Sequence, residues 1–248
     1  MAGSEAEKLF EKKHTCPICE NEFTAKTVRT GKARMIRTDM DLRNVYEGIE
    51  PLKYDIILCP KCGYAALSRF FPSVTAVQQK YISEKITPNF KPLNEGSEEY
   101  TYEQALTRYK VAFANTVVKM GKVSEGAYLC LKVAWLCRSY KENLDTNEAG
   151  YQGKYDKIET MERENLRKAY DYFIKAVQTE SFPMCGMDES TVDYLLAVLA
   201  MEFEDYFDSS KLLSKLITSY SAGQRLKDRA REAKEELSRR MKEAGVEA

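Results

Sequence analysis

The spacing of hydrophobic residues changes near residue 72 and divides the chain into two parts. Before this point, apolar residues come in short runs separated by turn-forming and charged residues, as is typical of short strands. After it, apolar residues recur every three to four positions, as is typical of amphipathic helices. We therefore expect a mainly α protein, with a small β head in residues 1–72 and a helical body in residues 73–248.

The helical body is expected to contain seven helices. Small polar residues that accept hydrogen bonds from the first turn predict helix starts at Ser73, Thr101, Ser124 and Asp188, and Thr101 with Gln104 forms a capping box. The expected helices span about 73–86, 101–120, 124–140, 155–179, 188–204, 207–220 and 224–244.

The head is expected to contain three strands, near residues 24–30, 33–38 and 53–58. Thr30-Gly31 is a turn signal between the first two strands. Asp39 and Asp41 follow the second strand, and we interpret them as turn residues rather than as ligands of a hard metal ion.

A small–large–small pattern at positions 0, +4 and +7 recurs in three of the expected helices. It resembles the second helix of a tetratricopeptide repeat, in which small residues let neighbouring helices approach closely. An insertion before the middle copy breaks the 34-residue period, so a generic α-helical bundle is the alternative. The pattern comprises Ala105, Tyr109 and Ala112, then Ala169, Phe173 and Ala176, then Ser209, Leu213 and Leu216.

The tetratricopeptide-like register predicts which side chains face a concave groove. In the helix over 124–140 these include Lys132, Trp135 and Arg138, and in the helix over 188–204 they include Tyr194 and Met201. Trp, Tyr and Arg dominate the energetics of many protein interfaces. We therefore expect these five residues to bind a protein or peptide partner, although for Trp135 a role as a core anchor is the favoured interpretation.

Four of the seven cysteines form two matched pairs, Cys16 with Cys19 and Cys59 with Cys62. Two intervening residues allow one tight turn to aim both sulfurs at a single ion, and four thiolates complete a tetrahedral site. The pairs predict a structural zinc site. Iron in a rubredoxin-like centre and a dithiol redox role are the alternatives. We expect nearby His14 to be an exposed bystander rather than a ligand.

Five basic residues cluster between the cysteine pairs: Lys26, Arg29, Lys32, Arg34 and Arg37. On a zinc ribbon such a cluster could bind nucleic-acid phosphates. A solvated strand face is the simpler interpretation, so nucleic-acid binding is an alternative function.

Composition narrows the function classes further. The chain has 38 basic and 38 acidic residues and a single histidine, which argues against a globally basic nucleic-acid binder and against imidazole-based catalysis. The sequence shows no phosphate-binding glycine loop, nucleophile elbow or zinc-protease motif. With no signal peptide or membrane-spanning run, we expect a cytoplasmic protein whose cysteines stay reduced.

Residues 16–71 also carry a series of motifs: CPIC, RTGKARMIRTDMD, YEGIEPLKYD and CPKCGYAA, followed by FF. This series, with LKVAWLCR at 131–138, resembles an uncharacterised bacterial family that is best known from Firmicutes and carries a domain of unknown function. The resemblance implies a zinc-ribbon-like head and a helical-repeat body, and it supplies no activity.

Together these features predict a zinc-binding scaffold or adaptor that binds a protein or peptide through a helical groove. The alternatives are a nucleic-acid-binding zinc ribbon and a metal- or thiol-dependent enzyme.

Overall fold

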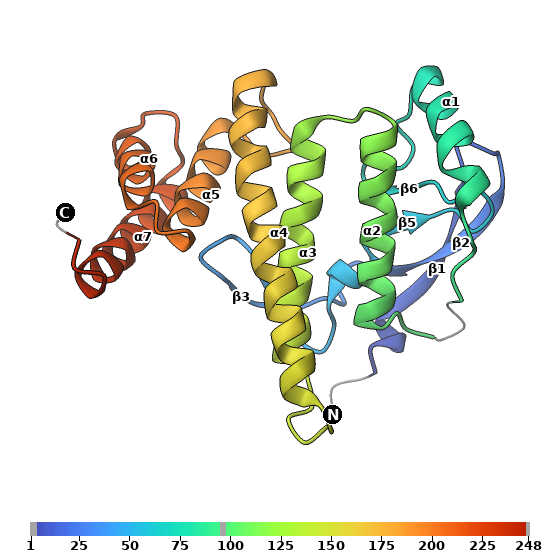
Figure 1. Cartoon of the computed structure of the whole chain (residues 1–248), viewed down its shortest axis with the longest axis horizontal. Coiled ribbons are helices and arrows are strands. Elements are labelled where there is room, and N and C mark those ends of the chain that lie inside the picture. Colours follow the sequence, from blue (N-terminus) through green and yellow to red (C-terminus); the bar gives the residue numbers. More distant parts are fainter. Residues whose placement is uncertain (1–3, 95–97, 247–248) are drawn as a thin grey trace.

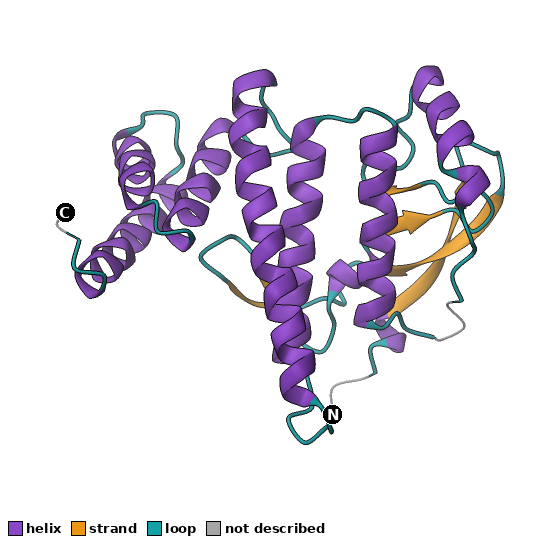
Figure 2. Ribbon diagram, viewed as in Figure 1, coloured by secondary structure: helices purple, strands orange, loops and turns teal. Residues whose placement is uncertain are grey.

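The computed structural model describes residues 4–94 and 98–246. It is mainly α-helical with a small β head, as the sequence predicted (Figure 2). The helices are α1 (Ala76–Lys85), α2 (Tyr102–Val118), α3 (Val123–Glu142), α4 (Tyr151–Thr179), α5 (Glu189–Glu202), α6 (Tyr206–Thr218) and α7 (Gln224–Glu243). Helices α2, α3 and α4 lie side by side, with α1 beyond α2 and α5–α7 beyond α4 (Figure 1).

The predicted helix starts are right in two cases and wrong in two. Thr101 caps α2 in a capping box with Gln104, and the Asp188 side chain accepts from the Thr191 amide at the start of α5. Helix α1 is instead capped by Thr75, whose box partner is Gln78. Helix α3 begins one residue before Ser124, because the Ser124 hydroxyl donates to Glu180 instead of capping the helix.

The strands of the described residues form three separate antiparallel hairpins. The first pairs β1 (Leu9–Thr15) with β2 (Glu22–Val28), the second pairs β3 (Met35–Thr38) with β4 (Asn44–Tyr46), and the third pairs β5 (Ile56–Leu58) with β6 (Ala65–Leu67). Three of these strands match the expected ones, whereas β1, β4 and β6 were not predicted. The short 3-10 helix η2 (Pro51–Tyr54) precedes β5.

The β5–β6 hairpin is buried on both of its faces. Ile56, Leu58, Ala65 and Leu67 pack with residues of α2 and α3, while Ile57 and Ala66 pack against the cysteine pairs on the opposite face. The Arg108 guanidinium on α2 donates to the Ile56 carbonyl, at 2.9 Å from Nη2. One hydrophobic core therefore joins the two sides of residue 72.

The residues of the small–large–small pattern all lie in the core. Each of the nine has an exposed fraction of 0 or 1%. They lie on α2, α4 and α6, the second members of successive helix pairs in the described chain. These positions have the close packing that small side chains allow, and the assignment to tetratricopeptide repeats stays a prediction.

Candidate functional site

The four paired cysteines meet at one point of the head. Their sulfurs all lie within 4.8 Å of one another. Cys16 Sγ is 3.5 Å from Cys62 Sγ, and Cys19 Sγ is 3.6 Å from Cys59 Sγ. A zinc–sulfur bond of about 2.3 Å in tetrahedral geometry places sulfurs about 3.8 Å apart. The thiol set therefore has the chemistry and the spacing of a tetrahedral metal site.

Each cysteine pair forms the turn of a hairpin, and the two turns have the same backbone hydrogen bonds. In the first, the Cys16 amide donates to Asn21 O and the Glu20 amide donates to Cys16 O. In the second, the Cys59 amide donates to Tyr64 O and the Gly63 amide donates to Cys59 O. This repeated turn aims both sulfurs of a pair in one direction, as a metal knuckle requires.

The residue after each pair has a positive φ, 57° at Glu20 and 76° at Gly63. Only the second position excludes a side chain by contact, because a Cβ on Gly63 would lie 2.3 Å from Phe90 Cγ. The Asn115 side chain on α2 donates to the Gly63 carbonyl at 3.0 Å. The second knuckle is therefore fixed directly against the helical body.

The thiols share their protons unequally because they are so close. Hydrogen bonding with Cys16 lowers the pKa of Cys59, while hydrogen bonding with Cys59 raises the pKa of Cys16. Hydrogen bonding with Cys16 also raises the pKa of Cys62. A cation bound among four sulfurs would replace these protons, so metal affinity is expected to fall at low pH.

His14 lies beside this cluster and is half-buried, so the expectation that it is exposed was wrong. Its ring is 5.8 Å from the ring of Phe23 and 6.0 Å from that of Phe71. Burial lowers its pKa. Among the described residues, the group of potential ligand atoms that converge here comprises the four cysteine sulfurs and does not include His14.

Two of the five residues expected to bind a partner, Trp135 and Arg138, contact a segment of this same chain. The tip of the β3–β4 hairpin, Asp39–Arg43, reaches the helices here. Asp41 Oδ2 accepts from Trp135 Nε1 at 3.0 Å and lies 2.9 Å from Arg138 Nη1. Arg138 also pairs with Glu162 on α4 at 2.8 Å.

The other three expected partner-binding residues are also buried. Lys132 pairs with Asp55 at 2.7 Å. Tyr194 and Met201 have exposed fractions of 1% and belong to the core of α5–α7, against which Met40 and Leu42 of the tip also pack. Partner binding by these five residues stays a prediction, and the structure shows that a partner would have to displace the tip to reach Trp135 and Arg138.

The basic cluster is spread over two hairpins, and several of its charges have partners. Arg34 pairs with Glu47, and Arg37 pairs with Asp39 and Glu142. Lys26 lies over the ring of Tyr100 and Arg29 over that of Phe10, while Lys32 lies in the connection between β2 and β3. Nucleic-acid binding by this cluster stays a prediction.

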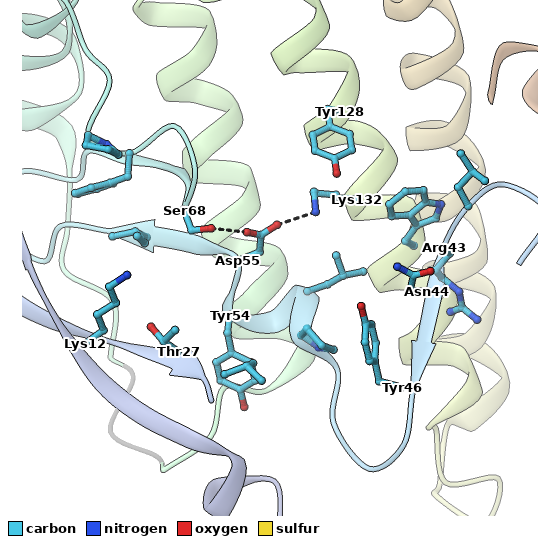
Figure 3. A pocket seen from close by; sticks show the side chains of 18 of the residues that line it. Lys12, Thr27, Arg43, Asn44, Tyr46, Tyr54, Asp55, Ser68, Tyr128 and Lys132 are labelled. Atoms are coloured by element: carbon cyan, nitrogen blue, oxygen red, sulfur yellow. Dashed lines mark hydrogen bonds and ion pairs between the residues drawn. The ribbon is translucent and has the colours of Figure 1, made fainter. Parts of the chain in front are cut away.

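The sequence did not indicate a cleft that lies between the head and α3. Its volume is about 810 Å³, and Lys12, Asp55, Ser68, Tyr128 and Lys132 are among the residues that line it (Figure 3). These residues come from strands and helices far apart in sequence, so no local motif could have identified the cleft.

Comparisons with known proteins give a family but no activity. A family model described as "Uncharacterized protein conserved in bacteria (DUF2225)" matches residues 9–237. A protein of Borreliella burgdorferi, described as an uncharacterized protein, is 25% identical over 179 residues. The alignment covers 66% of this chain and 58% of that relative, so the chain spans little more than half of the relative's length. No solved structure matches. In the described residues, no helix is both long and apolar enough to cross a membrane.

Proposed function

We propose a function for this chain from the premise that it belongs to the family of uncharacterized proteins conserved in bacteria, DUF2225. The family description assigns no activity, so the proposal depends on the site. We propose that the protein is a zinc-binding scaffold that acts by binding partners rather than by catalysis. The observation that carries the proposal is the convergence of four cysteine sulfurs within 4.8 Å.

The donor set favours zinc in a structural role. Four thiolates fill a tetrahedral coordination sphere and leave no position for a reactive water. Cys16, Cys59 and Cys62 are buried, as in sites that hold a metal away from substrate. When bound, zinc supplies cross-linking of the two knuckles rather than Lewis-acid chemistry. Iron in the same four-sulfur set is the alternative metal.

The position of the cluster explains what the metal would hold together. The β5–β6 hairpin packs on α2, and the Asn115 side chain fixes its knuckle there. The β1–β2 hairpin lies on the other side of the sulfurs and carries Cys16 and Cys19. A zinc ion would therefore tie the first hairpin to a head already anchored to the helices.

Metal analysis of the full chain, purified under reducing conditions, tests this proposal. We expect one zinc per chain and no visible absorption band. The Cys16→Ser variant should lose most of the metal, whereas the matched Cys185→Ser variant, which changes a cysteine outside the cluster, should keep it. A wild-type chain without stoichiometric metal would refute the proposal, and one iron per chain with a visible thiolate band would assign the alternative.

The adaptor part of the proposal concerns the helical body. Trp135 and Arg138 already hold one aspartate of this chain, which is how they would hold an acidic segment of a partner. Capture from the native bacterium should therefore yield more of a given partner with the Asp41→Asn variant than with the wild type. Equal capture by the two chains would contradict partner binding at this groove.

A further inference from the structure

The cleft between the head and the helical body has the size of a small-molecule site. Its volume of about 810 Å³ lies within the range of about 300–1,000 Å³ that is usual for ligand pockets. Its walls come from β1, β2, β4, η2, α3 and α5, so it lies where the two parts of the chain meet. Ligand sites occur preferentially at such junctions.

The ion pair between Asp55 and Lys132 forms a polar group in this cleft, together with the side chains of Ser68 and Tyr128 (Figure 3). Lys132 Nζ lies 2.7 Å from Asp55 Oδ2, and Ser68 Oγ donates to Asp55 Oδ1 at 2.8 Å. Lys132 Nζ also lies 4.7 Å from the centre of the Tyr128 ring. Although burial lowers the pKa of Lys132, the charge of Asp55 holds it above its ordinary value, so Lys132 stays protonated.

The charges that line the cleft are unbalanced, although those of the whole chain are equal in number. Four cationic residues line it, Lys12, Lys13, Arg43 and Lys132, and Asp55 is the single carboxylate among the described lining residues. Arg43 is neutralised by Asp39 at 2.7 Å and Glu142 at 2.6 Å, and Lys132 by Asp55. Lys12 and Lys13 are exposed, and no ion pair of either is found within the described ranges.

The rest of the cleft offers apolar and aromatic surface. Leu42, Pro51, Leu195 and Met187 line it, together with the rings of several aromatic residues. In Figure 3 the hydroxyls of Tyr46 and Tyr128 point into the cavity from opposite sides. An apolar lining with a few convergent polar groups is the usual composition of a site for a small organic molecule.

We propose that this cleft binds a small organic anion with an aromatic or apolar body. The body occupies the space between Tyr46, Tyr128 and Trp135, and the acidic group lies near Lys12, to whose positive charge Lys13 on the opposite face of β1 adds. The buried Asp55–Lys132 pair provides one acceptor and one donor for polar groups of the ligand. This inference concerns a different site from the cysteine cluster and does not depend on which metal that cluster holds.

The test uses 8-anilinonaphthalene-1-sulfonate, an aromatic anion whose emission rises in apolar surroundings. N-phenyl-1-naphthylamine, which has the same aromatic body without the sulfonate, is the uncharged comparison. Trp135 is the chain's single tryptophan and lines the cleft, so its emission reports whether a probe binds there. We expect the sulfonate to bind once per chain, to quench Trp135, and to bind more tightly than the amine.

Variants separate recognition of the anionic group from nonspecific hydrophobic binding. The Lys12→Gln/Lys13→Gln variant should raise the dissociation constant of the sulfonate by about 5- to 30-fold and leave that of the amine unchanged. The control variant, Lys157→Gln/Lys175→Gln, removes equal charge from the exposed face of α4 and should leave both constants unchanged. Absence of saturable quenching, equal affinity for the two probes, or equal losses in the two variants would overturn the proposal.

Discussion

The contact between Asp41 and the helical body gives the sharpest test of the fold. The Asp41 carboxylate is 7% exposed, accepts a hydrogen bond from Trp135 Nε1 and pairs with Arg138. Replacing Asp41 with alanine removes both interactions and leaves the Trp135 N–H without its acceptor. Arg138 keeps its 2.8 Å pair with Glu162, so its charge is not left unpaired.

The expected loss follows from these contacts. A hydrogen bond to a charged group stabilises by about 1.5–3 kcal/mol, and breaking a buried ion pair completely costs about 3–5 kcal/mol. Because Arg138 retains one partner, we expect Asp41→Ala to lower the free energy of unfolding by about 2–4 kcal/mol. This loss corresponds to a folding equilibrium constant about 30- to 700-fold lower.

Urea unfolding followed by the emission of Trp135 measures this loss, because the reporter lies at the perturbed contact. Asp41→Asn keeps an acceptor for the indole and should lose less than the alanine variant. Asp228→Ala, which breaks the half-exposed pair with Arg231, is the control and should cost no more than about 0.5 kcal/mol. If Asp41→Ala and Asp228→Ala cost the same, the tip does not hold the helices as described.

Three further changes test other parts of the structure. Gly63→Ala should lower the unfolding temperature and the zinc content together. An L residue at φ 76° costs about 1–3 kcal/mol, and its Cβ would overlap Phe90. A variant with wild-type zinc content and stability would contradict this. Leu213→Ala, at a fully buried position, should lower the free energy of unfolding by about 2–5 kcal/mol in urea, and a loss below 1 kcal/mol would refute its core position. Burial raises the pKa of Asp39, but the hydrogen bond and charge of Arg43 outweigh this and hold it below its ordinary value. The stabilisation from Asp39 is therefore present above about pH 4 and lost as the pH falls through the pKa of Asp39 in the folded chain. The Asp39→Asn variant should lose less stability than the wild type on acidification, and an equal loss would refute this.

The sequence was sufficient to predict the cysteine cluster because its determinants are local. Two residues between Cys16 and Cys19, and again between Cys59 and Cys62, aim each pair of sulfurs in one direction whatever the rest of the chain does. The long helices were predictable for a similar reason, since a 3.6-residue period extends over many turns. The ends of the helices were less predictable, because the Ser124 hydroxyl donates a hydrogen bond to Glu180, which is distant in sequence, instead of capping α3.

The unpredicted strands lack the pattern that marks a strand with one buried face. Strand β1 has mostly polar residues after Leu9, and it pairs with β2 because the knuckle at Cys16–Cys19 turns the chain back on itself. Strands β4 and β6 are three residues each, too short for any periodicity to show. The position of β6 depends on its contacts with α2, which lies far away in sequence.

The residues assigned to a partner groove show what a helical pattern can and cannot reveal. The tetratricopeptide-like register placed Trp135 and Arg138 in a groove that binds a partner, and this stays a prediction; in the structure both residues hold a segment of this chain through Asp41. The register could not indicate that the segment belongs to the same chain, because Asp41 and Trp135 are 94 positions apart. The cleft beside Lys132 was hidden for the same reason.

The thiol cluster encloses residues 20–58, and the tip of the β3–β4 hairpin lies within this loop. A cation that holds both ends of the loop restricts the volume through which the tip moves, and so lowers the entropy lost when the tip settles on its helices. The two events are linked thermodynamically, so the helices that retain the tip must strengthen cation binding by the same factor. Weaker contacts between the tip and α3 would therefore lower the affinity of the cysteine cluster for its cation.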